Sequence, residues 1–198
     1  MRRLLLRQVK LFLLLLIGYL LQVCVMPYCK VGTITPSMIV ACIAVVTVGY
    51  GRLRAFWAGA FFGILTETFL ASVPMMYLML YPVVALLCSV ACADKTANRL
   101  QYERSIGLPG RNINPLLRTV VCAILNALCI EVVNLVYAYL RGAVLTGTAV
   151  GRAAMCIITT ALLTALVMVP MRRFLGFRKP VEKSPEEVRY GKPMQINP

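Results

Sequence analysis

Residues 11–26 read LFLLLLIGYLLQVCVM, a run of sixteen residues without a charged side chain, and Pro27 ends it. With the leucines at 4–6, this run approaches the ~20 apolar residues that an α-helix needs to cross the hydrocarbon core of a bilayer. Four basic residues precede its centre, as in a secretory signal peptide, but no cleavage site of small residues follows. The stretch therefore predicts an uncleaved first membrane span over about 5–26.

Five further apolar runs follow the first one. They predict spans at about 34–50, 55–71, 74–93, 116–140 and 150–170. Pro36 opens the second run in its first turn, and Pro170 stops the sixth. Only residues 51–54 separate the second and third runs, so we expect these two to form a helical hairpin. The pattern predicts an all-α integral membrane protein with one domain of six transmembrane helices (1–176) and a disordered cytoplasmic tail (177–198).

The composition excludes a soluble protein. Hydrophobic residues make up 60% of the chain and charged residues 14%, against 45–50% and about 25% in soluble domains. A soluble protein of 198 residues could not bury that much apolar surface. The formal net charge is +14, but the basic residues lie at the ends of apolar runs and not on a face of their own. This placement indicates contact with anionic lipids and argues against nucleic-acid binding.

The basic residues also predict an orientation. With six spans, the N-terminus, residues 51–54, the 94–118 loop and the segment after Pro170 lie on one side and hold 18 of the 21 Lys and Arg residues. The other side holds Lys30, Arg141 and Arg152. Five or seven spans would lose this separation. The positive-inside rule then places both termini in the cytoplasm of a protein that spans the cell inner (plasma) membrane several times.

Motifs for catalysis or metal binding are missing from the sequence. There is no histidine, and the eight cysteines form no C-x-x-C pair. No P-loop, G-x-S-x-G or H-E-x-x-H motif occurs. We therefore expect no enzymatic activity, no metal and no cofactor. Cys24 and Cys29 approach the outer face, where a disulfide is chemically permitted, although both can equally serve as small apolar side chains.

Two carboxylates fall inside the predicted spans, namely Glu67 and Glu131. A carboxylate within the bilayer costs a few kcal/mol and usually faces a partner or a cavity. At 100° per residue, Glu67 continues a face of small residues that includes Gly59 and Gly63. On the fifth span, Glu131 shares a face with Asn134, Arg141 and three alanines.

These faces have two interpretations. Small residues let helix backbones approach closely, and polar groups then bond across the contact. The faces can therefore hold the bundle together, with Glu131 bonded to Asn134 or Arg141 nearby. Alternatively, they form a binding site for a partner or a ligand. The sequence leaves both readings open.

The order of these features resembles the rod shape-determining protein MreD family. The resemblance rests on a basic start, Leu21-Gln22 before Pro27, Pro36 opening the second span, and the stretch GAFFGILTE over 59–67. This stretch is similar to the family's Gly-Phe-x-x-Gly-Leu-x-x-Asp pattern. Glu67 stands where the family usually has aspartate, Ala60 replaces its phenylalanine, and Ser37 follows Pro36 where an acid is often found.

The resemblance implies a non-enzymatic component of the bacterial cell-elongation complex. Members of the family work with the single-span protein MreC, the actin-like protein MreB, and the glycosyltransferase–transpeptidase pair that builds lateral peptidoglycan. Their six-helix fold is similar to the substrate-binding subunits of energy-coupling-factor vitamin transporters. A small-molecule-binding subunit of such a transporter is therefore the rival hypothesis, and a transporter of a small lipid or peptidoglycan precursor is a third. The short outer connections favour the interaction protein.

Overall fold

The structure is a computed structural model that describes residues 2–32, 34–70, 75–92, 105–106, 114–144 and 146–176. Most of the predicted loop at 94–118 and the whole of the predicted tail at 177–198 lie outside these residues.

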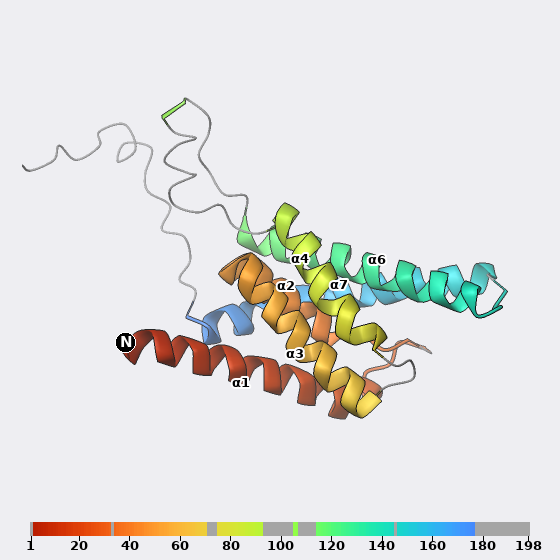
Figure 1. Ribbon diagram of the computed structural model, residues 1–198, viewed down its shortest axis with the longest axis horizontal. Helices are drawn as coiled ribbons and strands as arrows, with labels where there is room; N and C mark the ends of the chain where they lie inside the picture. The colour runs from red at the N-terminus through yellow and green to blue at the C-terminus, as the bar shows by residue number, and fades with distance from the viewer. Residues whose placement is uncertain are drawn as a thin grey trace, which may run out of the picture.

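Helices account for almost all of the described chain, which contains no named strand. A short 3-10 turn, η1 (Met26–Tyr28), follows the first helix, and Figure 1 shows the helices packed into one bundle. The six longer elements are α1 (Arg2–Cys24), α2 (Met38–Tyr50), α3 (Arg52–Leu70), α4 (Met76–Cys92), α6 (Pro115–Leu140) and α7 (Gly147–Phe174). The predicted all-helical class is confirmed.

Helix α2 lies at the centre of this bundle. Every residue from Met38 to Val48 is buried, and none is more than 3% exposed. Helices α1, α3, α4, α6 and α7 all contact α2. A helix that is apolar on every side is stable only when other elements surround it, and α2 has this composition. The core of the protein therefore forms around α2.

The lengths of the helices confirm part of the predicted membrane architecture. Three helices are long and apolar enough to cross a membrane, and they cover Gln8–Tyr28, Pro115–Leu140 and Gly147–Phe174. Helices α2 and α4 are apolar but shorter, with 13 and 17 residues. At 1.5 Å per residue, α6 is about 39 Å long and α2 only about 20 Å. The hairpin of α6 and α7 accordingly reaches beyond the other helices (Figure 1).

Several helix ends that contain basic residues lie at one end of the bundle. The beginnings of α1, α3 and α6 and the end of α7 lie at this end in Figure 1, and they carry Arg52, Arg54, Arg118 and Arg173. Lys30 and Arg141 belong to connections at the opposite end. Successive described helices therefore run in opposite directions. This arrangement brings basic segments that are far apart in the sequence to the same end of the bundle.

The boundaries of the second and third helices differ from the prediction. Pro36 is buried but lies outside α2, because Ser37 is the N-cap and the helix begins at Met38. The Ser37 hydroxyl accepts a hydrogen bond from the Val40 N–H, and this cap starts the helix after the proline. The connection predicted at 51–54 is Gly51 alone, whose φ of +83° suits glycine.

Candidate functional site: polar groups inside the helix bundle

The small-residue face of α3 packs on α4 of the same chain. A Cβ atom placed on Gly59 would lie 2.7 Å from the Tyr81 carbonyl oxygen and 2.8 Å from the Pro82 Cα. One placed on Gly63 would lie 2.9 Å from the Leu78 Cα. These distances are too short for any side chain, so both glycines are needed for the backbones to approach. This face is therefore covered within the chain and is closed to a partner helix.

Glu67 links the end of α3 to the beginning of α4. Its Oε1 accepts a hydrogen bond from the backbone N–H of Met75, which directly precedes α4 and has a positive φ of 61°. A carboxylate is favourable near a helix N-terminus because the N–H groups there lack partners within the helix. The second oxygen, Oε2, is buried and has no hydrogen-bond partner among the described residues.

Glu131 lies near a residue of another helix and not against the expected neighbours on its own helix. Its carboxyl group interacts with the thiol of Cys156 on α7. Asn134 is half-buried and makes no side-chain hydrogen bond within the described chain. The guanidinium of Arg141 lies 5.6 Å from the centre of the Tyr137 ring. Glu131 is therefore not joined to Asn134 or Arg141. Its carboxyl group lies between α6 and α7 instead.

Two tyrosines of α4 lie near these carboxylates. The Tyr77 side chain is within electrostatic range of both Glu131 and Glu67. Its ring packs on that of Tyr81 with centroids 5.5 Å apart. Tyr81 in turn lies near Thr66, whose buried hydroxyl has no hydrogen-bond partner among the described residues. We call Thr66, Glu67, Tyr77, Tyr81 and Glu131 the polar cluster. It joins α3, α4 and α6 inside the bundle.

A second polar contact holds the beginning of α2. The Ser37 N–H donates to Thr160 Oγ1 of α7 at 3.1 Å, and the Met38 N–H donates to Gln22 Oε1 of α1 at 2.5 Å. The Ser37 hydroxyl accepts from the Val40 N–H at 3.3 Å. The first N–H groups of a helix have no acceptor within it, and leaving them unbonded in an apolar bundle is expensive. Three helices therefore meet at the N-terminus of α2.

The hydrogen bonds of Gln22 and Thr160 and the ring contact of Tyr77 were not predicted from the sequence. Gln22 offered a signal, because it is an amide within an apolar run of sixteen residues. Thr160 offered none, since threonine also bonds within its own helix, as Thr159 does to the Met155 carbonyl at 2.8 Å. Cys24 and Cys29 are both exposed and free of disulfides.

The chemistry available to these groups is hydrogen bonding and proton binding. Among the residues that the structure describes, no three Cys, Asp or Glu side chains gather closely enough to hold a metal ion. No protein-family model matches the chain, and no curated protein or solved structure matches it either. The inference of function therefore rests on the sequence pattern and on this geometry.

Proposed function

We propose that this protein is a non-enzymatic membrane component of the bacterial cell-elongation complex, as its resemblance to the MreD family implies. The observation that carries the proposal is the stretch 59–67, which resembles the family's third-span pattern. The contacts of Gly59 and Gly63 with α4 give this stretch a physical role in the bundle. The direct partner would be MreC, with MreB and the glycosyltransferase–transpeptidase pair in the same assembly.

We further propose that all six helices lie in the inner membrane with both termini in the cytoplasm. The grouping of Arg52, Arg54, Arg118 and Arg173 at one end of the bundle supports this orientation (Figure 1). Anionic lipids of the inner leaflet would then contact this end.

The tip of the α6–α7 hairpin is the surface that we propose for MreC. Helix α6 is about 9 Å longer than the ~30 Å hydrocarbon core, and the α6–α7 hairpin reaches beyond the other helices at this end (Figure 1), so we place this tip outside the hydrocarbon core. Leu140 and Val144 there are 76% and 83% exposed, and with Tyr139 they line an open groove. Apolar side chains outside the hydrocarbon core favour burial against a partner.

Affinity purification from native membranes tests the proposal. The tagged protein is solubilised in mild detergent, and co-purifying proteins are identified by mass spectrometry, with an unrelated multi-span protein as the control. Enrichment of MreC supports the proposal. Leu140→Glu and Val144→Glu should reduce this enrichment, whereas Leu53→Glu, which is equally exposed at the opposite end, should not. Absence of MreC with full recovery of the inserted protein would contradict it.

The rival function is a small-molecule-binding subunit of an energy-coupling-factor vitamin transporter. The polar cluster favours it, since convergent polar groups inside a bundle are typical of ligand sites. The grooves at α1–α3 and at the α6–α7 tip are not lined by the cluster, however. The same purification separates the hypotheses, because a transporter subunit would bring with it ATPase subunits and a bound small molecule.

A further inference from the structure

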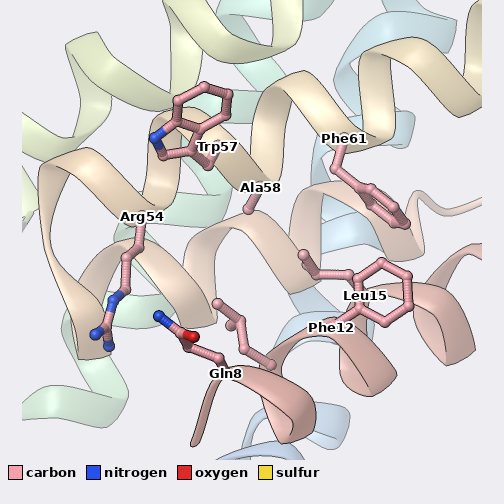
Figure 2. A pocket seen from close by; sticks show the side chains of 8 residues that line it. Gln8, Phe12, Leu15, Arg54, Trp57, Ala58 and Phe61 are labelled. Atoms are coloured by element: carbon pink, nitrogen blue, oxygen red, sulfur yellow. The ribbon is translucent and has the colours of Figure 1, made fainter. Parts of the chain in front are cut away.

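An open groove of about 210 Å³ runs between α1 and α3, apart from the polar cluster. Figure 2 shows its two walls. Gln8 of α1 and Arg54 of α3 point toward one another at one end. Phe12 and Phe61 line the other end, with ring centroids 5.5 Å apart. The groove is therefore lined almost wholly by apolar surface, with the polar groups of Gln8 and Arg54 at one end.

This polarity follows the axis of the bundle. Arg54 and Phe61 are seven residues apart on α3, which corresponds to about 10 Å along the helix. The polar end lies where α1 and α3 begin, near Arg52 and the other basic side chains (Figure 1). The guanidinium of Arg54 is held 4.6 Å from the centre of the Tyr50 ring. A fixed cation above an apolar channel matches the order of a phosphate headgroup and an acyl chain.

Trp57 marks the boundary between the two ends. It lies three residues after Arg54, lines the groove and is 64% exposed. Tryptophan is enriched at the membrane interface, where its ring meets the headgroup region. The level of Trp57 therefore fits the border between headgroups and hydrocarbon.

We propose that the groove binds one molecule of an anionic phospholipid. Arg54 and the amide of Gln8 would contact the phosphate, and the acyl chain would lie along Leu15 and the two phenylalanines. Arginine recognises phosphate through its planar set of donors. A helix of a partner protein fits less well, because it would bring an apolar face against Arg54 and Gln8. The inference requires only that the protein lies in a membrane and is independent of the proposed binding of MreC.

The single tryptophan of the chain provides the experiment. The purified protein is reconstituted into phosphatidylcholine vesicles that contain a small fraction of brominated phosphatidylglycerol or, in parallel, brominated phosphatidylcholine. Bromine quenches the fluorescence of a nearby indole, so quenching of Trp57 reports which lipid occupies the groove. We expect the anionic lipid to occupy it about five-fold in excess of its bulk fraction, which is what an attraction of about 1 kcal/mol between Arg54 and a headgroup of net negative charge would give.

Variants separate a specific site from general attraction. Arg54→Gln should abolish the preference, and Gln8→Leu should roughly halve it, since Gln8 offers only a neutral donor. Arg52→Gln is the matched control. It removes the same charge two residues before Arg54, and the Arg52 side chain does not line the groove. It should leave the preference unchanged. Equal quenching by the two lipids, or equal losses for Arg52→Gln and Arg54→Gln, would overturn the proposal.

Discussion

The backbone N–H of Ser37 donates a hydrogen bond of 3.1 Å to Oγ1 of Thr160, across 123 residues of the chain. It ties the start of the buried helix α2 to the middle of α7. The neighbouring bond from the Met38 N–H to Gln22 adds α1 to the same point. Because α2 contacts each of the five other long helices that the structure describes, its position sets the position of the whole bundle.

Thr160→Val should destabilise the protein by about 1 to 2 kcal/mol. The substitution keeps the shape of the side chain but removes the acceptor, which leaves the Ser37 N–H unbonded next to buried residues. Thermal unfolding in detergent measures the effect. Thr159→Val is the matched control, because Thr159 bonds only to its own helix. Equal midpoints for the two variants would show that the bond between helices adds nothing.

Gly63→Ala should separate α3 from α4. The new methyl group would lie 2.9 Å from the Leu78 Cα and the Tyr77 carbonyl oxygen, and neither backbone atom can move alone. Overpacking of this kind typically costs about 1 to 3 kcal/mol, and Gly59→Ala should behave in the same way.

Gly151→Ala provides the contrast to Gly63→Ala. Gly151 is also helical, but nothing lies within 4 Å of the added Cβ. Alanine favours a helix over glycine by about 1 kcal/mol, so this variant should be neutral or slightly more stable. Chemical unfolding of all three variants measures the differences. A Gly63→Ala variant as stable as Gly151→Ala would refute the close contact of α3 and α4.

Glu67→Gln should be tolerated better than Glu67→Ala. The amide oxygen can still accept from the Met75 N–H, whereas alanine leaves that group unbonded at the start of α4. We expect Glu67→Ala to lose about 1 kcal/mol of stability, and Glu67→Gln to lose less. The recovered monodisperse fraction after heating compares them. An equal loss for both would instead indicate that the negative charge itself is needed, for example through the unpartnered Oε2.

The proposed orientation predicts the activity of reporter fusions. Alkaline phosphatase is active only outside the cytoplasm, so fusions after Lys30 and after Gly142 should be active and one after Gly107 should be silent. The physical reason is that 18 of the 21 basic residues lie in segments on the side of the silent fusion. An active fusion after Gly107 would refute the six-span arrangement.

Several features could be predicted from the sequence because they depend on local composition. The apolar runs predicted six helices close to those observed, and the composition of 38–48 already indicates a helix buried on all sides. The close approach at Gly59 and Gly63 was equally readable, since it depends only on the spacing of small residues along one helix. The apolar run predicted Pro36 in the first turn of its helix, whereas the helix begins at Met38. The run crosses this boundary because the cap is a single serine, so the run alone does not mark the first helical residue.

Only the tertiary structure decided what each of these faces contacts. The spacing of small residues along one helix indicates that another backbone can approach Gly63. It does not indicate whether that backbone belongs to this chain or to another protein. The structure places α4 there, which leaves the tip of α6–α7 and the groove between α1 and α3 as open surfaces. In the same way, Glu131 has Asn134 near it on its own helix, yet its carboxyl group lies near Cys156 of α7. Hydrogen-bond partners inside a bundle are set by the packing of helices distant in sequence, and no periodicity within one helix encodes them.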